Sequence, residues 1–321
     1  MEKAIKDFAK QFSYEPVIEN ASQWKSYERF VVLGMGGSHL AGDLLKMWDP
    51  LLPLLSHRDY GLPPFSETEL KQCLIIASSY SGNTEEPLDA FMRARDKGYA
   101  VAAVSIGGTL LELAKSMGIP FIQMPDTGIQ PRLALGFSLR ALLKLLGKED
   151  ALRETATLSS TLDPLRYERQ GKEIAARIKG KIPLIYASSR NLPLAYTWKI
   201  KFNETGKMPA FYNVFPELNH NEMTGFDAND QTRHFSKWFH VFLLKDPNDH
   251  PRILKRMDVL KHLYQERGIV VEALDLEGES VFHKVASSLV LADWAAFYTA
   301  EQYGLEAEEV PMVEELKRII A

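Results

Sequence analysis

The chain has 321 residues, of which 45% are hydrophobic and 25% charged, and a formal net charge of −4. This balance is ordinary for a globular protein and argues against a nucleic acid or an anionic membrane as partner, since both favour a basic face. The single cysteine, Cys73, excludes a disulfide framework and a metal site built from cysteines.

The N-terminal stretch MEKAIKDFAKQF is charged and lacks the apolar core of a signal peptide. No run of about 18 apolar residues is present, so no membrane-spanning helix is expected. We therefore expect a cytoplasmic protein. A chain of this length predicts two domains or one large α/β unit.

The first half of the sequence alternates short apolar runs with helical patterns. Residues 29–48 predict a strand, a glycine turn and a helix, and residues 71–98 repeat that order. A strand at 99–108, a helix at 109–118 and a short strand at 119–125 follow. Such alternation is typical of βαβ units, in which helices cover both faces of a parallel sheet.

The same alternation restarts after a helical stretch at 132–150 and a charged helical connection at 151–180. The second series consists of strands at 181–189, within 234–246 and at 268–278, and of helices at 191–207 and 280–304. We therefore predict an α/β protein with two tandem domains, 1–150 and 151–321, each a mostly parallel sheet flanked by helices.

The segment GMGGS, residues 34–38, lies where the first strand passes into a helix. Glycines permit close backbone approach, and a helix start offers free N–H groups and a positive dipole end. His39 stands where a dinucleotide-binding fingerprint has its third glycine, and no Gly-Lys-Ser/Thr follows as in a P-loop. Nucleotide binding therefore has little support, and a tight strand–helix turn is the structural alternative.

The segment SSYSGNTEEPL, residues 78–88, places many hydroxyls directly after the apolar run CLIIA. A phosphate monoester accepts several hydrogen bonds, which hydroxyls and the N–H groups of a helix start supply. Ser79, Ser81 and Thr84 suit such a ligand. The alternative is an N-cap by Ser81 or Asn83, but a cap needs one side chain rather than three.

These motifs together resemble those of a known family. GMGGS followed by SYSGNT resembles a sugar isomerase (SIS) domain. The block KFNETGKMPAFYNVFPELNHNEMTGF, residues 201–226, and the terminal VEELKRIIA are similar to those of the bifunctional phosphoglucose/phosphomannose isomerases, a branch of the phosphoglucose isomerase superfamily. The resemblance covers nearly the whole chain.

This resemblance implies two SIS domains and a homodimer whose active site is shared between subunits. It also implies reversible isomerisation of glucose 6-phosphate or mannose 6-phosphate to fructose 6-phosphate, without a metal or a cofactor. The implied phosphate-binding residues are Gly36, Gly37, Ser38, Ser79, Ser81 and Thr84. The implied catalytic residues are the base Glu204, the ring-opening His220, Arg132 and Lys317.

The implied residue types suit the reaction. One carboxylate can remove a proton from C2 and return it to C1 through an enediolate. A histidine near its working pKa suits the proton transfer of ring opening, and we expect Asn219 and Asn221 to orient His220. Arg132 offers permanent charge toward the enediolate, and Lys317 can assist at the ring oxygen. From residue type alone, each is also compatible with an ordinary solvated side chain.

Three positions depart from the family pattern. His39 follows the first serine where a small residue is usual, and it either crowds the phosphate or points away along the helix. The second-half loop reads ASSR, residues 187–190, where a glycine is common. Val310 and its neighbours lack the threonine associated with use of both hexose epimers, which bears on dual specificity.

Two alternatives stay open: a catalytically silent SIS module that binds a sugar phosphate as a regulator, and an amino-sugar-phosphate isomerase. The presence of Glu204, His220, Arg132 and Lys317 favours the enzyme. No His/Asp/Glu set has convincing metal spacing, since His220 with Glu222 is too local for a complete site. A metal-dependent phosphomannose isomerase is therefore disfavoured.

Overall fold

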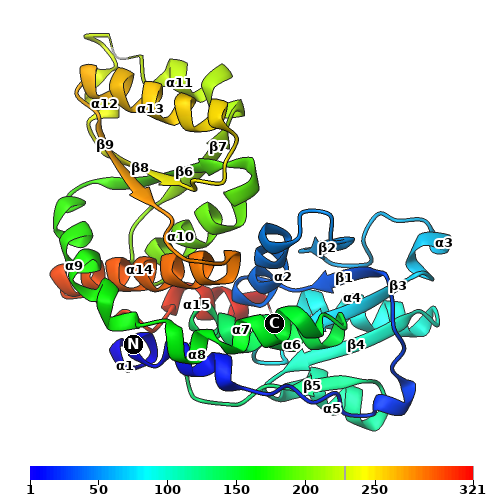
Figure 1. Cartoon of the computed structure of the whole chain (residues 1–321). Helices are drawn as coiled ribbons and strands as arrows, with labels where there is room; N and C mark the ends of the chain where they lie inside the picture. Colours follow the sequence, from blue (N-terminus) through cyan, green and yellow to red (C-terminus); the bar gives the residue numbers. More distant parts are fainter. Residues whose placement is uncertain (228, 321) are drawn as a thin grey trace. The chain divides into compact units, whose positions relative to one another are not determined.

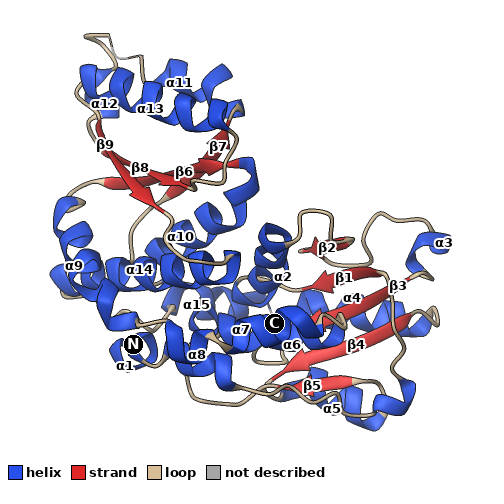
Figure 2. Ribbon diagram, viewed as in Figure 1, coloured by secondary structure: helices blue, strands red, loops and turns tan. Residues whose placement is uncertain are grey.

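The computed structural model describes residues 1–227 and 229–320, and it divides into two compact units (Figure 1). The first unit comprises residues 7–162, and the second comprises residues 1–6 with 163–320. Each unit holds one sheet whose strands are all paired in parallel, with helices on both faces (Figure 2). The predicted α/β class, with one helix-flanked parallel sheet per unit, is confirmed.

The first unit is built on a five-stranded sheet in the order β2-β1-β3-β4-β5. Its strands are β1 (Arg29–Leu33), β2 (Leu54–His57), β3 (Cys73–Ser78), β4 (Ala100–Ser105) and β5 (Phe121–Gln123). Its helices are α2 (Gly37–Trp48), α3 (Glu67–Leu70), α4 (Glu85–Asp96), α5 (Gly108–Ser116), α6 (Leu135–Leu145), α7 (Glu149–Ala156) and α8 (Leu158–Thr161).

Both faces of this sheet are covered, which explains why its strands are continuous apolar runs. On one face, Val31 and Ile75 belong to a buried cluster with Phe91 of α4 and Leu110 of α5. On the other face, α2 lies over Val32 and packs against α6. The helices that follow β1 and β3 therefore lie on opposite faces.

The second unit is built on a four-stranded sheet in the order β7-β6-β8-β9. Its strands are β6 (Ile182–Ser188), β7 (Phe211–Phe215), β8 (Phe239–Lys245) and β9 (Val270–Asp275). Its helices are α1 (Glu2–Lys6), α9 (Glu168–Arg177), α10 (Leu192–Glu204), α11 (Glu222–Gly225), α12 (Arg233–Ser236), α13 (Pro251–Glu266), α14 (Val281–Gln302) and α15 (Pro311–Ile320).

Successive residues of β8 serve opposite faces, as the two-residue period of a strand requires. Val241 shares a buried cluster with Met257 of α13. Phe242 instead contacts the rings of Trp198 and Phe202 on α10. Figure 1 shows α13 on one side of this sheet and α10 with α14 on the other.

The division between the units falls at residues 162/163, rather than near residue 150 as predicted. The physical reason is the buried guanidinium of Arg140 in α6. It donates to the carbonyl oxygen of Leu152 at 2.8 Å and to Oγ1 of Thr155 at 3.0 Å, and so binds α7 to the first unit. At the other end of the chain, Ile5 is buried and α1 packs against α14 of the second unit.

Candidate active site

Two loops of the first unit meet at the carboxyl edge of its sheet. Strands β1 and β3 are neighbours, yet the chain continues from β1 to β2 on one side and from β3 to β4 on the other. The order of the strands therefore reverses between β1 and β3. In open parallel sheets, ligands bind in the crevice at such a switch point. The GMGGS and SYSGNT segments follow these two strands and lie at this crevice.

Glycine at position 37 is required by a close backbone approach. A Cβ atom on Gly37 would lie 2.8 Å from the carbonyl carbon of Pro131 and 2.9 Å from the backbone nitrogen of Arg132. Gly36, with φ +50°, makes the turn that starts α2. The approach places Arg132, in the short 3-10 helix η3 (Pro131–Leu133), next to the GMGGS turn, where its side chain is 1% exposed.

Two of the predicted phosphate-binding serines hydrogen-bond within the crevice: Ser79 within its own loop, and Ser38 from the first loop to the second. The Ser79 side chain is fully buried: Oγ donates to Oγ1 of Thr84 at 2.9 Å and accepts from the N–H of Gly82 at 3.1 Å. Ser38 Oγ, also buried, accepts from the N–H of Tyr80 at 3.0 Å. These bonds give both serines a structural task at the crevice.

Ser81 and Thr84 remain accessible at the start of α4, so they are the hydroxyls best placed to meet a ligand. The alternative in which Ser81 or Asn83 caps α4 is wrong. Thr84 occupies the N-cap position and makes no capping bond with its side chain. Asn83 Oδ1 instead accepts from the N–H and the hydroxyl of Thr109, at 3.0 and 3.1 Å, and so binds the first turn of α5.

His39 points along α2. Its ring is 1% exposed, and Nδ1 bonds Oδ2 of Asp43, one turn further on, at 2.9 Å. Burial of Asp43 opposes its charged form, but the bond from His39 and the charges of His39 and Arg58 prevail and hold the pKa of Asp43 below its usual value. Of the two orientations open from the sequence, the one along the helix is observed.

Glu204 is the last residue of α10 in the second unit, and its side chain is partly exposed. The carbonyl oxygen of Lys201 accepts the N–H groups of Thr205 and Gly206, at 2.9 and 3.1 Å, which ends the helix there. Nζ of Lys207 donates to the carbonyl oxygen of Glu204 at 2.6 Å. The backbone that carries the predicted base is therefore held from both sides.

His220 ends the 3-10 helix η6 (Glu217–His220), and its side chain is exposed. The neighbouring amides hydrogen-bond to other groups: Asn219 Oδ1 accepts from Arg256 at 3.2 Å, and Asn221 Nδ2 donates to Glu217 at 2.8 Å. These contacts fix the loop around the histidine, and orientation of its ring by the two amides stays a prediction.

Lys317 lies in α15, where every described residue is exposed. Its Nζ bonds Oε1 of Glu314, one turn earlier, at 2.7 Å. Met312, Leu316 and Ile319 of the same helix are also exposed, so α15 presents apolar as well as charged side chains to solvent. Glu204, His220 and Lys317 thus stand on three separate elements of the second unit.

The ASSR loop of the second unit lies at that sheet's own switch point, between β6 and β8, and is filled by a carboxylate that the sequence prediction missed. Asp249 accepts from Oγ of Ser188 at 2.6 Å and from Nδ2 of Asn191 at 3.3 Å, and all three side chains are buried. Burial, together with the nearby charge of Asp246, raises the pKa of Asp249 despite the bond from Ser188. The carboxylate of Asp249 therefore lies at the switch point between β6 and β8, where an open parallel sheet otherwise binds a ligand.

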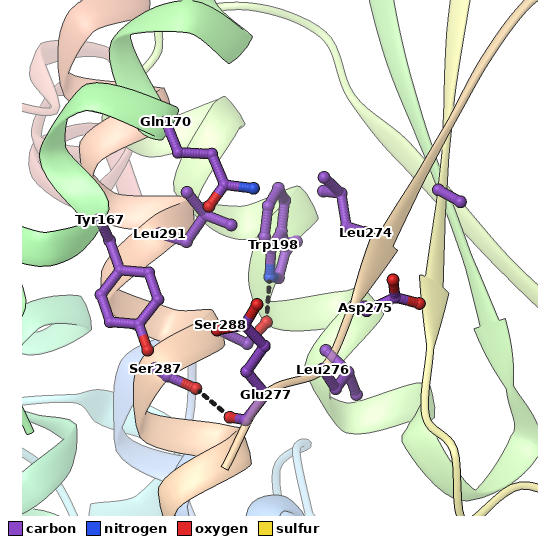
Figure 3. Close-up of a pocket in the computed structure, with 11 residues that line it drawn as sticks. Tyr167, Gln170, Trp198, Leu274, Asp275, Leu276, Glu277, Ser287, Ser288 and Leu291 are labelled. Atoms are coloured by element: carbon purple, nitrogen blue, oxygen red, sulfur yellow. Dashed lines mark hydrogen bonds between the residues drawn. The ribbon is translucent and has the colours of Figure 1, made fainter.

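A cavity of about 170 Å³ lies in the second unit between β9, α9, α10 and α14, and Figure 3 shows the residues that line it. Its lining includes Tyr167, Trp198, Asp275 and Ser288, and none of the predicted site residues.

Within residues 1–227 and 229–320, His, Cys, Asp and Glu side chains form no group of three or more suited to a metal ion. No helix of this described part is long and apolar enough to cross a membrane.

Known proteins resemble this chain in sequence over most of its length. Residues 167–320 match the family described as "Bacterial phospho-glucose isomerase C-terminal SIS domain". A bifunctional phosphoglucose/phosphomannose isomerase from Aquifex aeolicus is 35% identical over 98% of this chain and 96% of its own. The protein of that name from Caldicellulosiruptor bescii is also 35% identical, over 92% of this chain and 90% of its own.

Solved structures show the same fold at low sequence identity. The C-terminal domain of glucosamine-fructose-6-phosphate aminotransferase from Francisella tularensis gives a TM-score of 0.68 at 14% identity. The alignment covers 97% of each chain.

Proposed function

The chain belongs to the bifunctional phosphoglucose/phosphomannose isomerase family, and from this premise we propose that it interconverts glucose 6-phosphate, mannose 6-phosphate or both with fructose 6-phosphate. The structural observation that carries the proposal is the crevice between β1 and β3, with accessible Ser81 and Thr84 at the start of α4. Such a crevice suits the phosphate that these sugars share. The reaction takes place in the cytoplasm and needs no metal or cofactor in this proposal.

In this proposal the phosphate accepts hydrogen bonds from Ser81, Thr84 and the free N–H groups of the helix starts. Ser79 and Ser38 keep the loops in shape through the bonds described above. Gly36 allows the backbone of the first turn to approach the ligand, and Gly37 allows the same turn to approach the backbone of Pro131 and Arg132. The phosphate thereby anchors the sugar while the chemistry takes place at C1 and C2.

Glu204 is the base of the proposed reaction. Its carboxylate removes the C2 proton of the open-chain aldose, which leaves an enediolate, and then delivers the proton to C1. The side chain is partly exposed, and the backbone beneath it is held by hydrogen bonds of Lys201 and Lys207. Arg132 supplies positive charge for the enediolate oxygens.

His220 and Lys317 open the sugar ring in this proposal, by moving a proton between the C1 hydroxyl and the ring oxygen. We place His220 in the active site of the partner subunit of a homodimer. Its exposed side chain supports this, because it is available to a second chain. The exposed apolar side chains of α15 also support an association between copies.

The test is an assay of purified protein with glucose 6-phosphate, mannose 6-phosphate and glucosamine 6-phosphate in separate reactions. Formation of fructose 6-phosphate from either of the first two, undiminished by a chelator, is the expected result. Binding of these sugar phosphates without turnover would instead identify a regulator. Turnover of the amino sugar alone would identify an amino-sugar-phosphate isomerase, and restoration of chelated activity by zinc would contradict metal independence.

A further inference from the structure

A fully buried ion pair lies in the second unit, outside the residues assigned above. Nζ of Lys201 in α10 is 2.6 Å from Oδ1 of Asp293 in α14. The side chains of both residues are 1% exposed. Lysine and aspartate are almost never buried to this extent unless they are paired.

Stability alone does not explain why the chain keeps this pair. Removal of two charges from water costs several kcal/mol per ion in real proteins, and the attraction between the charges often only offsets that cost. Apolar side chains of similar volume in place of a buried pair commonly leave a protein as stable or more stable. The presence of the Lys201–Asp293 pair is better explained by the segment whose position it holds.

The pair holds the last turn of α10, which carries the proposed base. Lys201 precedes Glu204 by three residues, so both lie in one helical turn. The backbone of Lys201 also ends the helix, because its carbonyl oxygen accepts the N–H groups of Thr205 and Gly206. A movement of Lys201 along or around the helix axis would therefore move Glu204 with it.

A second bond joins the same two helices one turn earlier. Nε1 of Trp198 donates to Oγ of Ser288 at 2.9 Å, and Figure 3 shows this bond at the edge of the cavity of about 170 Å³. The Trp198 ring is fully buried and also packs on Phe202 and Phe242, so apolar packing and a hydrogen bond act together at this turn. Apolar contacts have no direction, whereas the polar bonds at Trp198 and Lys201, three residues apart, add two directional links between α10 and α14.

We propose that the buried Lys201–Asp293 pair is a positioning device for the general base, in that it sets the register of α10 against α14 and thereby the place of the Glu204 carboxylate. The proposal rests on the proposed function. A single base that serves both C1 and C2 must be placed accurately, since a misplacement of about 1 Å can cost about 100-fold in rate. Lys201 and Asp293 themselves touch no substrate in this proposal.

The test is the double variant Lys201→Met/Asp293→Leu, which removes both charges together and replaces them with apolar side chains of similar length. We expect a melting temperature at or above that of the wild type. The kcat should fall by about 10- to 100-fold, while KM stays within about twofold, because the phosphate is bound by the first unit. Lys201→Met/Asp293→Asn removes the same contact with a smaller change in shape and replaces the first variant if that one does not fold.

The matched control is Arg177→Met/Glu272→Gln, which removes a bidentate ion pair between α9 and β9 of the same unit. We expect its kcat to stay within about threefold of the wild type, since this pair does not touch α10. The conservative variant Asp293→Asn keeps an oxygen acceptor for Lys201 and should retain more kcat than either double variant.

A folded double variant with the kcat of the wild type would overturn the proposal, as would an equal loss of kcat in the control. Failure of both double variants to fold would also overturn it, because the pair would then serve the fold itself. An inactive wild-type protein, or a Glu204→Gln variant with normal kcat, would instead contradict the proposed function. Affinity for fructose 6-phosphate, measured by calorimetry, should be alike in wild type and folded variants.

Discussion

Replacement of Ser79 by alanine should destabilise the first unit, although serine-to-alanine is a small change. The hydroxyl of Ser79 is fully buried and makes three contacts: it donates to Thr84 Oγ1 at 2.9 Å, and it accepts from the N–H groups of Gly82 at 3.1 Å and Thr84 at 3.4 Å. The N–H of Gly82 keeps a second acceptor, the Ser79 carbonyl oxygen at 3.1 Å. The loss is therefore close to one good hydrogen bond and one partly unsatisfied donor.

A net hydrogen bond contributes about 1 kcal/mol, and an unsatisfied buried donor costs about as much again. We thus expect Ser79→Ala to lower the free energy of unfolding of the first unit by about 2 kcal/mol. For a unit of this size, the corresponding fall in Tm is about 4–8 °C. Differential scanning calorimetry and denaturant titration measure both quantities.

Ser81→Ala is the matched control for Ser79→Ala. Ser81 is exposed, and its Oγ accepts only a long bond from the N–H of Asn83, at 3.3 Å. Its replacement should change stability by less than about 0.5 kcal/mol. Equal Tm values for Ser79→Ala and the wild type, or equal losses in the two variants, would refute the structural role of Ser79.

Three further outcomes are expected. Ser81→Ala/Thr84→Ala should raise KM for sugar phosphates with little change in kcat, and Tm should fall by a few degrees because Ser79 Oγ loses its acceptor on Thr84. An unchanged KM in the folded variant would contradict phosphate binding at α4. A mixture of inactive Glu204→Gln and His220→Ala proteins should regain activity on subunit exchange; no recovery after demonstrated exchange would place both residues in one chain's own site. Asp43→Asn should be less stable than the wild type at pH 7, because the folded-state pKa of Asp43 is lowered and its charge stabilises the fold above the unfolded pKa of about 3.9. That difference should vanish as pH falls through the folded pKa, and unfolding curves that differ equally at pH 7 and pH 3 would count against it.

The central strands of both sheets could be predicted because helices cover both of their faces. β1, β3, β6 and β8 are apolar runs in the sequence, and all four are interior strands. β2 and β7 gave no such signal: both are short edge strands with partly exposed residues, although the edge strands β5 and β9 could be predicted. The helix α13 was also not predicted. Its apolar residues do recur at helical spacing, with Met257, Leu260 and Tyr264 buried and Ile253 and Leu254 packed beside them, so the signal was present in the sequence and was missed.

The position of the site loops could be predicted from their residue types, but the structural or ligand-binding role of each hydroxyl could not. Ser79 and Ser81 are both serines of one short segment, yet one is buried and the other is exposed. Their difference arises from the turn at Gly82, which has φ +74° and lies against Gly107, far along the chain. Lys201 and Asp293 lie 92 residues apart, so no local pattern indicates that they meet.

The most direct test of Glu204 as the base is the fate of deuterium at C2 of the substrate. The wild-type protein should exchange C2 deuterium with solvent during turnover, since the carboxylate carries the proton between carbons. Glu204→Gln keeps the shape of the side chain without its basicity. It should stop this exchange and lower kcat by about 10²–10⁴-fold, while fructose 6-phosphate still binds. Near-normal turnover and exchange in Glu204→Gln would place the base elsewhere, with Glu217 as the next carboxylate to test.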